Sequence, residues 1–121
     1  QAKMNDFNAA QGTNIELQMA NVLGDLSDAI KLAPKNGYLY YNRGTLYALR
    51  NDNQRAIDDY TRAIQLEQNL AEAYYNRGLV FIRLKRVDEA VTDLSKAGEL
   101  GLYQAYSVIK KYTGKNKELK I

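Results

Sequence analysis

Two adjacent carboxylates, Asp58 and Asp59, are the residues of this chain that most resemble a catalytic pair. Neighbouring carboxylates act as general acid and general base when their surroundings drive their pKa values apart. However, Arg55 precedes Asp59 by four residues and Arg62 follows Asp58 by four, a spacing that sets opposite charges side by side on a helix. Surface ion pairs are therefore the preferred interpretation, and we expect no catalytic residue here.

The composition excludes most other catalytic and metal-binding groups. The 121 residues include no histidine and no cysteine, which excludes thiol nucleophiles, imidazole bases and the usual zinc ligands. We therefore expect a protein that is not an enzyme and has no cofactor and no metal. The length suits one domain, and no apolar run approaches the ~20 residues of a membrane span. The absence of cysteine favours the cytoplasm but is compatible with an oxidising compartment.

The net charge of +3 is concentrated at the C-terminal end. The last twelve residues hold five lysines and one glutamate, a net charge of +4, so the other residues sum to −1. A basic tail can contact nucleic acid or an acidic membrane. This one is short and has no interleaved aromatic residues, so we interpret residues 114–121 as a disordered basic tail and expect no nucleic-acid partner.

The elements that position these residues are set by an internal repeat with a period of about 34 residues. Residues 37–68 and 71–102 align with nine identities in 32 pairs, where average composition gives about two. The longest shared run is Tyr40–Gly44 over Tyr74–Gly78. Apolar residues within each unit recur at helical spacing, which predicts two helices per unit.

The repeat predicts the organisation of the whole chain. Residues 1–14 are expected to be loosely ordered or a degenerate helix, with a loop and helix cap at 11–14. A partial repeat (15–36), two full repeats (37–70 and 71–102) and a capping helix (103–113) follow. The expected helices lie near 15–33, 37–50, 54–67, 71–84, 88–100 and 103–112.

Arginines and aspartates alternate through the repeats at corresponding positions. Three aspartates and two arginines recur at intervals of one repeat period, with one of these arginines between each two of these aspartates. The forked guanidinium suits bidentate pairing with a carboxylate. We expect a ladder of salt bridges between helices that fixes one repeat on the next; anion binding is the competing interpretation. The ladder comprises Asp25, Arg43, Asp59, Arg77 and Asp93.

These patterns resemble the tetratricopeptide repeat (TPR), in the form of a small bacterial-type member of that family, over residues 15–102. An aromatic residue followed four residues later by glycine occupies the first helix of each full unit, as Tyr40/Gly44 and Tyr74/Gly78. Small residues seven apart enclose a bulky one in the second helix: Ala56, Tyr60, Ala63 and Ala90, Leu94, Ala97. The resemblance implies a right-handed α-solenoid of antiparallel helix pairs.

The resemblance also implies a concave groove, lined by the first helices, that receives a peptide or partner segment. Tyrosine offers wide contact area at low entropic cost, and an asparagine amide can pair with a peptide backbone. The alternative is that these tyrosines pack against the ends of the stack. The expected groove residues are Tyr38, Tyr41, Asn42, Thr45, Tyr75, Asn76, Leu79, Arg83, Tyr106 and Lys110.

Some TPR proteins hold a C-terminal carboxylate with lysine, asparagine and arginine on successive first helices. Tyr41 and Thr45 stand where lysine and asparagine are expected, and only Asn76 and Lys110 fall near such positions. The resemblance therefore implies a non-catalytic scaffold that binds another protein, without favouring a carboxylate clamp. A self-associating structural module, or a fragment of a longer TPR array, is the alternative.

Overall fold

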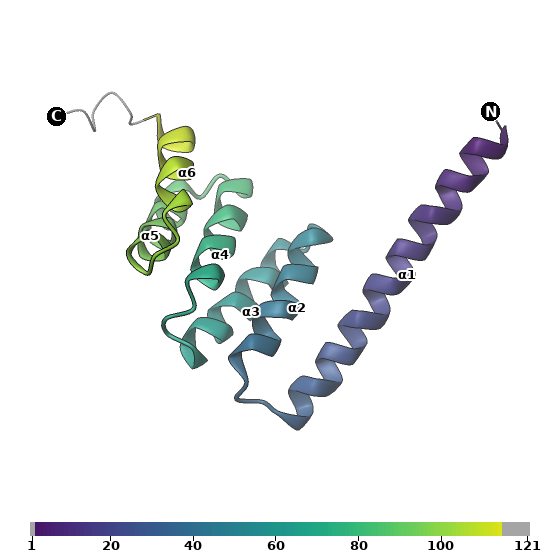
Figure 1. Ribbon diagram of the computed structural model, residues 1–121, viewed down its shortest axis with the longest axis horizontal. Helices are drawn as coiled ribbons and strands as arrows, with labels where there is room; N and C mark the ends of the chain where they lie inside the picture. The colour runs from purple at the N-terminus through teal and green to yellow at the C-terminus, as the bar shows by residue number, and fades with distance from the viewer. Residues whose placement is uncertain (1, 115–121) are drawn as a thin grey trace.

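The computed structural model describes residues 2–114, and side chains are described from residue 14 onward. This part of the chain forms six helices and no strand, which confirms the predicted all-α class. The helices are α1 (Ala2–Leu32), α2 (Gly37–Leu49), α3 (Asn53–Leu66), α4 (Ala71–Arg83), α5 (Val87–Glu99) and α6 (Gln104–Thr113). Figure 1 shows them stacked in chain order, with α1 and α6 at opposite ends. Within the described range, no helix is both long and apolar enough to cross a bilayer.

Packing joins helices that are neighbours along the chain. α2 packs on α3 and α4 on α5 as antiparallel pairs, and α3 contacts α4, α5 contacts α6 and α1 contacts α2 (Figure 1). The first helices of the two full repeats, α2 and α4, also touch each other. This is the arrangement of a helical solenoid, in which each unit buries its apolar face against the next.

Small residues allow the two helices of each pair to approach closely. A Cβ atom at Gly44 would lie 3.1 Å from the ring of Tyr60, and one at Gly78 would lie 2.9 Å from Leu94 Cγ. Tyr60 and Leu94 are fully buried at equivalent places in α3 and α5. Helix axes cross at short distance only where side chains are small, so these positions fix the geometry of each pair. The fully buried alanines of these two second helices are Ala56, Ala63, Ala90 and Ala97.

The turn inside each full repeat depends on one residue in the left-handed conformation. Asn51 has a φ of 60°, and Lys85, which holds the same place in the next repeat, has a φ of 62°. Asp52 then caps α3 by accepting the backbone N–H of Arg55. A residue in this conformation ends a helix and lets the chain reverse, so each full repeat becomes a hairpin.

The structure differs from the sequence-based expectation at the N-terminal end. The loop and cap expected at residues 11–14 are helical, because α1 continues from Ala2 to Leu32. Leu17 lies one repeat period before Asn51, and leucine is costly in the left-handed conformation. Gly12 alone costs a helix only about 1 kcal/mol. The first unit is therefore one helix about 46 Å long instead of a hairpin.

The predicted disorder of the basic tail concerns residues that lie, apart from Gly114, outside the described range. Gly114 itself follows α6 with a φ of 64°, the left-handed conformation common after a helix end.

Replacing Gly78 by valine tests the close approach within a repeat. The added atoms would collide with Leu94 in the core, and overpacking of this kind costs about 1–3 kcal/mol. Gly24→Ala is the matched control, because a Cβ atom there meets nothing within 4 Å and alanine favours a helix over glycine by about 1 kcal/mol. Urea unfolding followed by circular dichroism should therefore move the two midpoints in opposite directions. Equal midpoints would contradict the packing described here.

Candidate functional site

Two arginines on the first helices each clamp an aspartate on the second helix of the same repeat. Arg43 donates from Nε and Nη2 to Asp59 at 2.7 and 2.9 Å, and Arg77 donates to Asp93 at 2.7 Å from both atoms. Both aspartates are buried. The hydrogen bond that Arg43 donates to Asp59 raises the pKa of Arg43. Paired, parallel bonds of this type add geometric specificity as well as energy.

The third contact of each guanidinium reaches the preceding second helix. Arg43 Nη1 donates to Ser27 Oγ at 3.2 Å, and Arg77 Nη1 donates to Thr61 Oγ1 at 3.0 Å. This corrects the expected ladder, because the link between repeats is a hydroxyl and not a second aspartate. Asp25 is exposed on α1 and, among the described residues, makes no ion pair with Arg43.

The adjacent carboxylates take different partners from those expected. Asp59 faces Arg43 across the helix pair, and Asp58 accepts from Gln54 Nε2 at 2.9 Å. Arg55 instead pairs with the helix cap Asp52 at 2.8 Å. The expected Arg55–Asp59 and Asp58–Arg62 pairs are therefore wrong. Asp59 pairs with Arg43, and Arg62 donates to Gln65 Oε1 at 3.2 Å.

A cavity of about 150 Å³ opens between the first helices of the two full repeats. Four of the expected groove residues line it together: Thr45, Asn76, Leu79 and Arg83. Leu49, which helical spacing also places on this side of α2, lines it as well. Three residues that were not expected there complete the lining: Ala48, Tyr60 and Val80. These eight residues are called the groove below.

Hydrogen bonds hold the polar residues of the groove in place. Thr45 Oγ1 and the Tyr60 hydroxyl lie 2.9 Å apart at its floor, and burial raises the pKa of Tyr60. At its edge, Asn76 Nδ2 donates to the Tyr41 hydroxyl at 3.0 Å. The bond between Asn76 and Tyr41 joins α4 to α2, so the two first helices are fixed relative to each other.

Arg83 closes one end of the groove. Its Nη1 donates to the carbonyl of Ala48 at 2.9 Å and to Asn53 Oδ1 at 2.8 Å, with a longer bond to Asn51. Arg83 thus ties the C-terminal end of α4 to the turn between α2 and α3. Its positive charge also complements the carbonyl end of α2.

The other expected groove residues lie outside this cavity. Tyr38 and Asn42 are exposed on α2, and Tyr75 is half-buried against the core. On α6, Lys110 is exposed and Tyr106 packs over Gly98 of α5. The cavity therefore draws on α2, α3 and α4 and takes no residue from α6.

From the sequence, Tyr60 was identified only as the bulky residue of a second helix, and its hydroxyl at the groove floor was missed. The signal available was the difference between the repeats, because Tyr60 stands where the second repeat has Leu94. A buried tyrosine usually finds a hydrogen-bond partner, so a tyrosine in a core position predicts a nearby polar surface.

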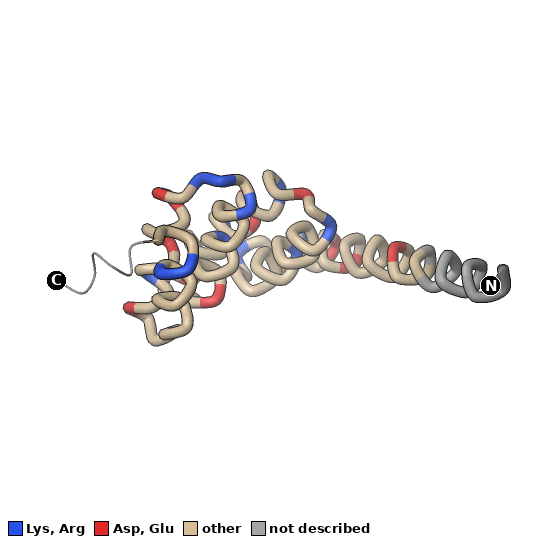
Figure 2. Tube along the Cα trace, turned by 90° about the horizontal axis from the view of Figure 1, so that it is seen from above, with Lys and Arg blue, Asp and Glu red and all other residues tan. Residues whose placement is uncertain are grey.

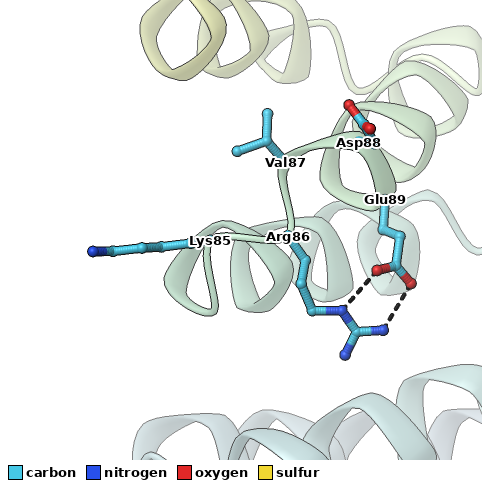
Figure 3. A pocket seen from close by; sticks show the side chains of 5 residues that line it. All are labelled: Lys85, Arg86, Val87, Asp88 and Glu89. Atoms are coloured by element: carbon cyan, nitrogen blue, oxygen red, sulfur yellow. Dashed lines mark hydrogen bonds and ion pairs between the residues drawn. The ribbon is translucent and has the colours of Figure 1, made fainter.

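A second hollow, of about 340 Å³, lies over the turn between α4 and α5 (Figure 3). Its five residues, 85–89, are consecutive and exposed. Arg86 and Glu89 satisfy each other through two hydrogen bonds of 2.6 and 2.8 Å, which lower the pKa of Glu89, while Lys85 points away. This hollow is lined by a single exposed turn whose Arg86 and Glu89 pair with each other, so the groove is the better candidate site.

Comparisons with known proteins assign the class. Family models described as "TPR repeat" and "tetratricopeptide repeat" match residues 44–85, 26–58 and 71–100. The chain belongs to the tetratricopeptide repeat family, as the sequence pattern predicted. A search of curated proteins found no match.

Solved structures share the fold. The first TPR of Spaghetti (RPAP3), bound to the HSP90 peptide SRMEEVD, is 22% identical with a TM-score of 0.77 over 82% of this chain and 80% of that one. The Arabidopsis OM64 TPR domain is 27% identical with a TM-score of 0.76, covering 80% and 82%. MamA is 26% identical with a TM-score of 0.74 over 83% of this chain, which spans only 61% of the MamA chain.

Removing one partner of the buried clamp should destabilise the stack. Asp93→Ala leaves Arg77 without its carboxylate, and breaking a buried pair in this way costs about 3–5 kcal/mol. Glu89→Ala is the control, because it removes the exposed pair with Arg86. In urea, Asp93→Ala should unfold at a clearly lower concentration while the control keeps the wild-type midpoint. A wild-type midpoint for both variants would show that the clamp contributes nothing to stability.

Proposed function

We propose that the chain is a non-catalytic scaffold that binds a segment of another protein in the groove between α2 and α4. The TPR family supports a protein-interaction role in general. The observation that carries the specific proposal is the cavity itself, which combines an apolar wall with fixed polar groups. Binding sites of this kind bury apolar side chains and use a few polar groups for orientation.

The groove suits a partner segment with an apolar side chain. Leu49 is 69% exposed at the rim, and Leu79 faces the same cavity. A leucine-sized side chain buried between them contributes roughly 1.5–3 kcal/mol. Asn76, and Asn42 on the neighbouring exposed surface of α2, supply amides that can pair with the backbone of the bound segment.

The groove does not favour a carboxylate as the main ligand. Its one cationic side chain, Arg83, is already hydrogen-bonded to the end of α2 through Nη1. The HSP90 peptide bound by the first TPR of Spaghetti (RPAP3) is therefore not the preferred model for the ligand of this chain. An apolar anchor is the preferred one.

Photo-crosslinking tests the groove directly. A photoreactive phenylalanine analogue placed at Leu49 should capture the partner from a lysate of the source organism, and the same analogue at Leu32 should not. Both side chains are exposed, at 69% and 88%, but Leu32 ends α1 beside the start of α2, whereas Leu49 is the last residue of α2. Equal capture at both positions would contradict the groove proposal.

The captured partner then allows a binding measurement. Asn42→Ala combined with Leu49→Ser should weaken binding about tenfold or more. A loss of about 1.4 kcal/mol of binding free energy lowers the affinity tenfold. Leu32→Ser should leave the affinity unchanged. The alternative of self-association remains a prediction, which sedimentation equilibrium of the wild-type chain tests separately.

A further inference from the structure

The second half of α1 occupies the place of a second helix in a repeat. Ser27 accepts a hydrogen bond from Arg43 as Thr61 does from Arg77, and these two hydroxyl residues are one repeat period apart. Leu23 and Ile30 are buried on the side of α1 that packs against α2. Residues 19–32 therefore correspond to α3 and α5, position by position.

The face of this segment that would meet its own first helix is uncovered. In α3 and α5 the four corresponding positions are at most 6% exposed. In α1 the same positions carry Val22, 45% exposed, the exposed Asp25, and the half-exposed Leu26 and Ala29. The reason is the continuous helix, which carries residues 2–14 away from this surface (Figure 1). These four residues are called the open face.

The molecule itself shows what covers such a face. α2 and α4 each present an arginine followed by glycine, with aromatic residues three before and four after the arginine. The arginine clamps the buried aspartate, and the glycine admits the opposing helix. Both guanidiniums also lie about 5.9 Å from the two flanking rings.

Neither residues 2–14 nor α6 offers a matching helix. Counting back one repeat period from Arg43 and Tyr47 gives Ala9 and Thr13, so residues 2–14 would leave Asp25 buried without a cation, at high cost. Counting forward by the same period from Arg77 and Gly78 gives Lys111 and Tyr112 on α6, where the tyrosine fills the place of the glycine. A second copy of this chain is therefore a poor occupant of the open face.

We propose that the open face docks an amphipathic helix of another protein, one that carries arginine followed by glycine or alanine between flanking aromatic residues. Its arginine pairs with Asp25, and its small residue lies over Leu26. Residues 14–32 of α1 carry three acidic residues and one basic residue (Figure 2), which favours a basic partner helix. This site lies at the end of the stack, apart from the groove, and completes the first repeat in trans.

A helical peptide with the sequence of residues 70–84 is the probe. A hydrocarbon staple across positions 72 and 76 keeps it helical, on the side opposite Arg77 and Gly78 of the helix. Its labelled form should bind the full chain saturably in fluorescence anisotropy. Asp25→Arg should weaken binding at least tenfold, and a peptide with Arg77→Asp should bind this variant better than it binds wild type.

Asp28→Arg is the matched control, because Asp28 is exposed on the same helix and corresponds to the exposed Arg62 of α3. It should bind the peptide as wild type does, and circular dichroism should show both variants folded. Failure of a demonstrably helical peptide to bind, or equal affinity for Asp25→Arg and wild type, would overturn the proposal. Loss of binding in Leu49→Ser but not in Asp25→Arg would place the peptide in the groove instead. If sedimentation shows that the wild-type chain dimerises and that Asp25→Arg abolishes the dimer, the open face binds a second copy instead.

Discussion

The clamp between an arginine of one helix and an aspartate of the next is the interaction on which this stack depends. Each guanidinium joins three helices, because it sits on a first helix, pairs with the second helix of its repeat and reaches a hydroxyl on the preceding second helix. Burying a charge is costly unless geometry and hydrogen bonds are nearly ideal. The helices are thus held in the one arrangement that satisfies all of these bonds.

The groove follows from this constraint. Once α2 and α3 are fixed by Arg43 and Asp59, the Tyr60 hydroxyl meets Thr45 between them. Once α4 is fixed on α3, Asn76 and Arg83 reach across to α2. The polar groups of the groove are therefore ordered before any ligand arrives, which lowers the entropic cost of binding.

The repeat allowed the helices from residue 37 onward to be located within one residue of their observed ends, because identical residues at a fixed spacing constrain both copies. The same period failed at α1, where Leu17 stands at the turn position and the helix continues through it. For the site, spacing predicts which side of a helix a residue occupies but not its partner. Arg55 had Asp59 and Asp52 within reach, and only the fold shows that Arg43 takes Asp59.

The packing of neighbours along the chain also shapes how the protein folds. The helices in contact are adjacent in the sequence or separated by one other helix, so forming the stack requires only short loops to close. Chains of such low contact order fold on the microsecond to millisecond scale. Stability in a linear stack is approximately a sum over units and their interfaces. The central α3 and α4 have covered surfaces on both sides along the stack, whereas α1 and α6 are each supported from one side, so the ends are the places where opening begins.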